Sequence, residues 1–218
     1  MATYDLEEQE QIDSLKTWWK MYGNLVTAVL AAAALSMVGW QGWNKYRDSQ
    51  AAQASALFAV LEAAALTGDM PKVKATAGEL AEKYASSSYA PLGALLAARH
   101  SIEAGDLKTA RSQLAWAADN GKDEVRDLAH YRLAAVLLDA KEYDEALKQL
   151  EAAPAPAFAA RFEELRGDVL FAQGKKPEAR AAYRAALDKM GQAAGVNKTA
   201  EPGRQLLQEK LDSLGEPA

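Results

Sequence analysis

The sequence predicts an all-α protein in which a single N-terminal transmembrane helix is followed by an α-solenoid of helical repeats. Three observations predict this fold class. An uncharged apolar segment lies between two pairs of tryptophans, alanine makes up 48 of the 218 residues without any alternating β-branched run, and the breaks between helices recur at a regular spacing. We expect a short acidic N-terminus over residues 1–20, a transmembrane helix over 21–44, and a solenoid with a C-terminal capping helix over 45–218.

The transmembrane helix is predicted from the range 21–44, which carries no charge. The 19 residues from Leu25 to Trp43 rise about 28 Å as an α-helix, close to the roughly 30 Å hydrocarbon core of a bilayer. Indole rings prefer the headgroup level, and a tryptophan pair lies near each end of the segment. These four residues are Trp18, Trp19, Trp40 and Trp43.

Two other interpretations of the apolar segment are open. A cleaved signal peptide should begin with basic residues, but residues 1–20 hold five acids and two lysines. A buried core helix would not require a tryptophan pair at each end. A membrane anchor that stays attached to the chain therefore fits best.

The remainder of the chain shows a repeat. Turns are predicted at Gly105, Lys141 and Gly174, which are 36 and 33 residues apart, and a weaker copy has its turn at 68–71 and its second helix up to Tyr84. This organisation resembles the tetratricopeptide repeat, a helix–turn–helix unit of about 34 residues. A simple helical bundle is the alternative.

Small and bulky residues recur at fixed offsets within the copies. The small residues, expected where paired helices touch, are Ala98, Ala134 and Gly167 on the first helices and Ala110, Ala117, Ala146, Ala153, Ala179 and Ala186 on the second helices. The recurring bulky residues are Leu114, Leu150 and Tyr183. After a predicted loop over 192–198, a leucine stripe predicts the capping helix; it consists of Leu206, Leu207, Leu211 and Leu214.

Composition argues against several classes of function. The chain has no cysteine, which excludes a thiol nucleophile, a zinc ribbon and an iron–sulfur centre. The net charge of −5 lacks the basic excess of a nucleic-acid binder. His100 and His130 stand alone, and no phosphate-binding loop, metal-binding pair or nucleophile elbow is present. We therefore expect no enzymatic activity, cofactor, metal, nucleic acid or small-molecule substrate.

The candidate binding surface is the concave groove that the first helices of such a solenoid form. From the repeat offsets, the groove is expected to present Leu92, Leu95, Arg99, Leu128, Tyr131, Arg161, Glu164, Asp168 and Phe171. Apolar side chains mixed with charges suit a protein partner. The alternative is that several of the apolar side chains simply pack between repeats.

The order of the parts resembles one family. The chain begins with Tyr4-Asp-Leu-Glu-Glu-Gln-Glu-Gln-Ile-Asp13, continues with Leu15-Lys-Thr-Trp-Trp-Lys20, and closes its apolar helix with Gly39-Trp-Gln-Gly-Trp43 before the repeats begin. This arrangement looks like the YfgM family, the ancillary subunits of the bacterial Sec translocon. The resemblance covers essentially the whole chain.

The resemblance implies an inner-membrane protein with a cytoplasmic N-terminus and a periplasmic solenoid. It also implies association with the SecYEG channel and with the membrane-anchored chaperone PpiD, in handling newly translocated proteins. Charge does not decide the orientation, because two basic residues flank the apolar helix on each side. One alternative is a cytoplasm-facing tetratricopeptide scaffold for envelope biogenesis, although the lipopolysaccharide regulator of that kind carries zinc-binding cysteines that are missing here. An enzyme with an unrecognised site is the other.

Overall fold

The computed structural model describes residues 4–193 and 202–215, and describes side chains over 11–191 and 203–215. Within these ranges the regular structure is helical and no strand is present, which confirms the all-α fold class. The chain divides into two compact units, Met1–Gln50 and Ala51–Ala218.

The first unit is formed by the long helix α1, Tyr4–Leu66, whose last residues belong to the second unit. Among the described residues, α1 contains the single stretch that is long and apolar enough to cross a bilayer. Its large apolar side chains are exposed; Leu25, Trp40 and Trp43 are 64%, 68% and 60% exposed. Within this unit its large apolar side chains are not packed in a core, so the buried-core interpretation does not hold for its described residues.

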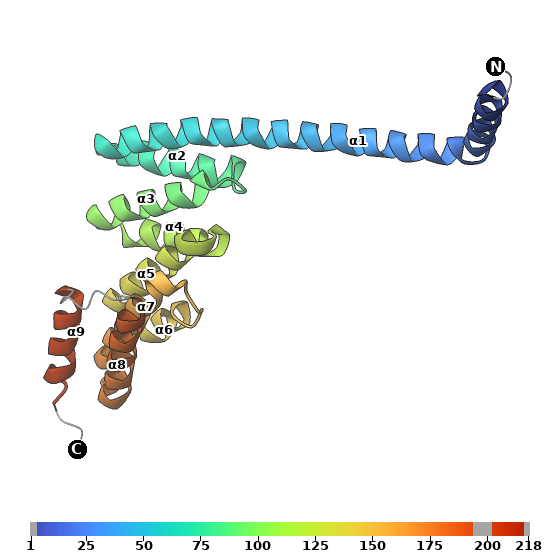
Figure 1. Ribbon diagram of the computed structural model, residues 1–218. Coiled ribbons are helices and arrows are strands. Elements are labelled where there is room, and N and C mark those ends of the chain that lie inside the picture. Colours follow the sequence, from blue (N-terminus) through green and yellow to red (C-terminus); the bar gives the residue numbers. More distant parts are fainter. Residues whose placement is uncertain (1–3, 194–201, 216–218) are drawn as a thin grey trace. The chain divides into compact units, whose positions relative to one another are not determined.

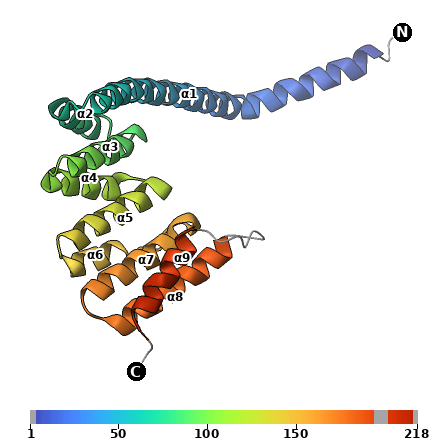
Figure 2. The same cartoon turned by 90° about the vertical axis from the view of Figure 1, so that its left-hand side faces the viewer.

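The second unit consists of helices stacked in chain order (Figures 1 and 2). From residue 51, the end of α1 pairs with α2. The later helices are α2 (Met70–Lys83), α3 (Tyr89–Glu103), α4 (Leu107–Asn120), α5 (Asp123–Asp139), α6 (Tyr143–Gln149), α7 (Pro156–Ala172), α8 (Lys176–Ala193) and α9 (Pro202–Ser213). The first helices of the repeats are the end of α1 together with α3, α5 and α7. The second helices are α2, α4, α6 and α8.

The turns within the helix pairs share one backbone conformation. Gly68, Gly105 and Gly174 have φ angles of 71°, 75° and 78°, in the left-handed region that glycine adopts without strain. Lys141 takes the same conformation with φ at 62°, although it carries a side chain. The predicted turns at positions 105, 141 and 174 are therefore confirmed, and Lys141 holds the glycine position of its repeat.

The small positions of the repeats lie between packed helices, with one exception. Eight of the nine predicted residues are buried. Gly167 shows why size matters, because a Cβ added there would lie 2.4 Å from the Tyr183 ring on α8. The prediction for Ala153 was wrong: it is exposed and follows the end of α6. Pro154 disfavours helical backbone at Ala153, so α6 stops early.

The last helix, α9, packs against α8. Leu207, Leu211 and Leu214 are buried in a cluster with Tyr183 and two alanines of α8. Leu206 was predicted to belong to this stripe, but it is 51% exposed. The loop predicted to begin at 192 was also placed too early, because α8 extends to Ala193. The rest of that loop, over 194–198, lies outside the described residues.

Candidate functional site

Two open hollows lie between neighbouring first helices. The hollow of about 430 Å³ between α1 and α3 is lined by Glu62, Ala65, Leu66, Leu96, Arg99 and His100. The hollow of about 400 Å³ between α3 and α5 is lined chiefly by Arg99, Ile102, Glu103, Arg132 and Val136. Arg99 borders both hollows. The surface of the first helices is therefore indented where neighbouring repeats meet, and we call it the first-helix face.

Some of the residues predicted for this face are part of the core. Leu95 is 5% exposed and packs in the main apolar cluster, so it cannot contact a partner, and the expectation for this residue is corrected. Leu128 is half-buried against the same cluster. Leu92 is 37% exposed and Phe171 is 47% exposed. Leu95 packs in the main apolar cluster, to which Leu92 does not belong, so two residues one helical turn apart on α3 differ in exposure.

Tyr131 and Arg161 lie on neighbouring first helices. Tyr131 is half-buried, and its ring centroid is 6.4 Å from that of Phe162 on α7. Burial raises the pKa of Tyr131, and the negative charge of nearby Glu164 raises this pKa further. Arg161 is exposed and places its guanidinium carbon 6.0 Å from the Phe158 ring centroid. Tyr131 thus contributes to packing between repeats, whereas Arg161 remains available at the surface.

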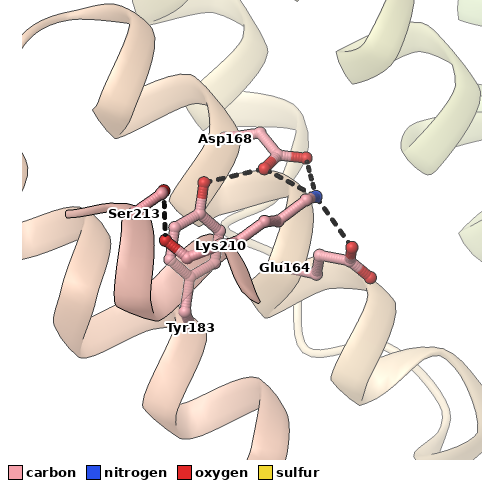
Figure 3. A network of polar contacts seen from close by, with 5 residues as sticks. All are labelled: Glu164, Asp168, Tyr183, Lys210 and Ser213. Atoms are coloured by element: carbon pink, nitrogen blue, oxygen red, sulfur yellow. Dashed lines mark hydrogen bonds and ion pairs between the residues drawn. The ribbon is translucent and has the colours of Figure 1, made fainter. Parts of the chain in front are cut away.

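The predicted acids Glu164 and Asp168 are engaged by the last helix. Figure 3 shows Lys210 of α9 between them, with its Nζ 2.8 Å from Glu164 Oε1 and 2.8 Å from Asp168 Oδ1. The hydroxyl of Tyr183 donates to the same Asp168 oxygen at 2.8 Å. Burial lowers the pKa of Lys210, but hydrogen bonds to Asp168 and Glu164 outweigh it, and the net effect is a raised pKa. These carboxylates therefore stabilise the docking of α9.

The α3–α5 hollow contains two arginines with different surroundings. The Nε of Arg99 donates to Glu103 Oε1 at 2.9 Å, in a pair whose side chains are 64% and 50% exposed. Arg132 is half-buried and has no hydrogen bond or ion pair within the described part of the chain. Burial lowers the pKa of Arg132, and the positive charge of Arg99 lowers it further. Neither cause is a carboxylate.

The repeat offsets did not identify Arg132 or Lys210. Arg99 aligns with Ala135 of the next copy, and Arg132 lies three residues before Ala135, on the same side of α5. A search one helical turn around each aligned position would have found Arg132. No comparable signal exists for Lys210, which lies outside the repeats and 42 residues from Asp168.

The buried carboxylate Asp127 has a structural explanation. It is 2% exposed and accepts a hydrogen bond from the backbone N–H of Ala155 at 2.7 Å. Its other oxygen is 3.2 Å from the guanidinium of Arg126. Asp127 therefore fixes the connection between α6 and α7. Within residues 11–191 and 203–215, no group of three or more histidines and acids could hold a metal ion.

A family model and two solved structures are similar to this chain. A family model described as a tetratricopeptide repeat-like domain matches residues 16–216. Two solved structures of MamA are also similar, one of a double mutant and one of the segment from residue 41 of MamA from Desulfovibrio magneticus RS-1. Each has a TM-score of 0.51 at 21% identity; they cover 93% and 94% of their own chains and 74% of this one. At this identity the likeness concerns the fold alone.

Relatives whose sequences match most of this chain share one name. A relative from Neisseria gonorrhoeae named "Ancillary SecYEG translocon subunit" is 36% identical over 96% of this chain and 98% of its own length. Relatives with the same name come from Haemophilus influenzae, at 30% identity over 83% of this chain and 88% of the relative, and from Escherichia coli, at 26% over 98% and 99%. The chain therefore belongs to the YfgM family, whose members are named ancillary SecYEG translocon subunits and carry a tetratricopeptide repeat-like domain.

Proposed function

We propose that the protein is a membrane-anchored, non-enzymatic adaptor that acts as an ancillary subunit of the Sec translocon. The observation that carries this proposal is similarity over both parts of the chain, because the Neisseria gonorrhoeae relative matches 96% of it. The exposed, tryptophan-flanked helix of the first unit would anchor the protein in the bacterial inner membrane. The second unit would lie in the periplasm, with the N-terminus in the cytoplasm.

In this proposal the second unit links the SecYEG channel to periplasmic chaperones that handle newly translocated proteins. The membrane-anchored chaperone PpiD is the partner that the family resemblance implies. The first-helix face is the proposed contact surface, since it exposes Leu92 and Phe171 together with the charged Arg99 and Arg161. Exposed apolar side chains surrounded by charges are typical of protein-binding surfaces.

The orientation is tested by cysteine labelling, which this cysteine-free chain permits without background. Ser86 is exposed in the turn between α2 and α3, so Ser86→Cys places a thiol on the second unit. In cells with a permeabilised outer membrane, a membrane-impermeant maleimide should modify this variant and should not modify Thr3→Cys. The opposite labelling pattern would support the cytoplasm-facing scaffold and exclude the translocon role.

Contact with the channel is tested on the membrane helix. Ala28, Ala32 and Ser36 follow one another at four-residue intervals, and a row of small residues allows close approach of another helix. Ala32→Leu should reduce recovery of SecYEG with the protein from detergent-solubilised membranes. Ala33→Leu adds the same volume to another side of the helix and should leave recovery unchanged. Equal recovery with both variants would show that this row does not contact the channel.

A further inference from the structure

The α3–α5 hollow contains an unsatisfied positive charge. Arg132 lines the hollow from α5, is half-buried, and has no hydrogen-bond or ion-pair partner among the described residues. Arg99 lines the same hollow from α3; burial, and after it the positive charge of Arg99, lower the pKa of the Arg132 guanidinium. Burial of an unpaired charge and repulsion between like charges both raise the free energy of the empty hollow.

The acids that line this hollow do not neutralise Arg132. Glu103 is engaged by Arg99 at 2.9 Å through one oxygen and by His100 at 3.1 Å through the other. The pair of Arg99 with Glu103 is exposed, so water competes for it and it contributes little free energy. Asp139 ends α5 and is exposed, and its charge is not among the influences on the pKa of Arg132. A carboxylate supplied from outside could therefore bind both guanidinium groups.

Apart from the two arginines and these two acids, the lining of the hollow is apolar, which restricts the kind of ligand that fits. Ile102, Ala135 and Val136 line it beside the two arginines, and Ile102 is 38% exposed. A guanidinium binds a carboxylate through two parallel hydrogen bonds, while apolar neighbours favour a ligand that carries hydrocarbon next to its charge. A free phosphate ion would satisfy the arginines but would leave Ile102 exposed to water.

We propose that the α3–α5 hollow is a docking site for an acidic segment of a protein partner, in which a glutamate or aspartate carboxylate binds Arg132 and Arg99 while an adjacent apolar side chain packs on Ile102 and Ala135. This inference rests on the proposed adaptor function and specifies the chemistry of the partner. It places the binding energy at the α3–α5 part of the first-helix face. Removing either the arginines or the carboxylates of the partner should then weaken binding.

The test uses the full chain in phosphatidylcholine nanodiscs and a fluorescein-labelled peptide of about twelve residues, in which glutamates alternate with leucines and both ends are capped. Fluorescence anisotropy measures binding. We expect Arg132→Gln to weaken binding about tenfold or more, and Arg99→Gln combined with Arg132→Gln to weaken it further. Raising the salt from about 50 to about 500 mM should weaken binding to the unmodified protein and affect the double variant little.

Two matched controls separate the hollow from general charge. Arg184 is exposed on α8 and has no partner within the described residues, so Arg184→Gln changes the net charge equally at a distant site and should leave binding unchanged. A second peptide replaces each glutamate by glutamine and should bind at least about tenfold more weakly to the unmodified protein. Equal weakening by Arg184→Gln and Arg132→Gln would overturn the proposal.

Three further outcomes would contradict it. In the first, the two peptides bind equally well. In the second, the glutamate peptide does not bind at concentrations up to about 1 mM. In the third, short-chain phosphatidylglycerol binds in a way that depends on the arginines, while the peptide does not bind. The last result would assign the hollow to a phosphate-bearing lipid. Recovery of SecYEG is measured for the same variants. If SecYEG is not recovered with the unmodified protein, the proposed function fails. If SecYEG is recovered but the arginine variants bind the peptide as tightly as the unmodified protein, only this inference fails.

Discussion

Two regions of the first-helix face differ in how their charges are paired, the α7 region and the α3–α5 region. On α7, Glu164 and Asp168 receive Lys210 from α9, and Asp168 also accepts from the Tyr183 hydroxyl. At the α3–α5 hollow, Arg132 has no partner among the described residues. Charges that the chain itself satisfies contribute to folding, whereas a half-buried charge without a partner raises the free energy of the folded chain. We infer that the α7 region serves stability and the α3–α5 region serves binding.

The largest effect on stability is expected at the contact of α7 with α8. In Gly167→Ala the new Cβ would lie 2.4 Å from the Tyr183 ring, so α7 and α8 must separate, at a cost of about 1–3 kcal/mol in the free energy of unfolding. Thermal unfolding followed by circular dichroism measures this loss. Gly78→Ala is the control, since nothing lies within 4 Å of its Cβ on α2, and it should gain about 0.5–1 kcal/mol. Equal behaviour of the two variants would contradict the close packing at Gly167.

Tyr183 and Lys210 in the α7 region should also make stability sensitive to alkaline pH. Burial and then the hydrogen bond to Asp168 raise the pKa of Tyr183 above its ordinary value of 10.0. The pKa of Lys210 is likewise raised above 10.5. Both groups hold their protons more tightly in the folded state, so their contribution is complete below about pH 10 and is lost as the pH rises further.

Urea unfolding at a series of pH values from neutral to alkaline tests this sign. The midpoint should fall as the pH rises above the ordinary pKa values of Tyr183 and Lys210. Tyr183→Phe removes one of the two titrating groups and should make the decline shallower. A midpoint that rises with pH, or a decline that is unchanged in Tyr183→Phe, would contradict the assignment of these shifts.

The smallest effect is expected at Lys141, in a turn that belongs to neither region. Lys141 has a φ angle of 62°, a left-handed conformation that costs a residue with a side chain roughly 1–2 kcal/mol. Lys141→Gly removes this strain but increases the freedom of the unfolded chain, so a net gain of about 0.5 kcal/mol is expected. Peptide binding should not change. A loss of stability would show that the Lys141 side chain makes a stabilising contribution that outweighs its backbone strain.

Local spacing made most of the fold predictable. The turns at Gly105, Lys141 and Gly174 and the buried small residues follow from a repeat in which each unit packs against the next in the same way. The spacing failed at Ala153, because Pro154 disfavours helical backbone there and α6 ends before the repeat pattern does. A repeat offset describes the average unit and cannot anticipate such a local interruption.

The candidate surface was less predictable than the fold. The offsets placed Leu95 on the first-helix face, but a rotation of α3 by less than one turn decides between surface and core, and the structure buries this residue. The pairing of Lys210 with Glu164 and Asp168 depends on how α9 docks, which no pattern within the repeats encodes. Arg132 stands out only when its surroundings show that it has no partner among the described residues.

The most direct test measures stability and peptide binding together for Lys210→Met and Arg132→Gln in the full chain. Lys210→Met leaves Glu164 and Asp168 without their cation and should cost about 1–3 kcal/mol of stability while peptide affinity is retained. Arg132→Gln should weaken binding of the glutamate peptide about tenfold and should not lower stability, because it removes a half-buried charge without a partner. Two results would contradict the division of the first-helix face into a region that serves stability and a region that serves binding. One is that Arg132→Gln destabilises the protein while it retains peptide binding. The other is that Lys210→Met abolishes peptide binding while stability is unchanged.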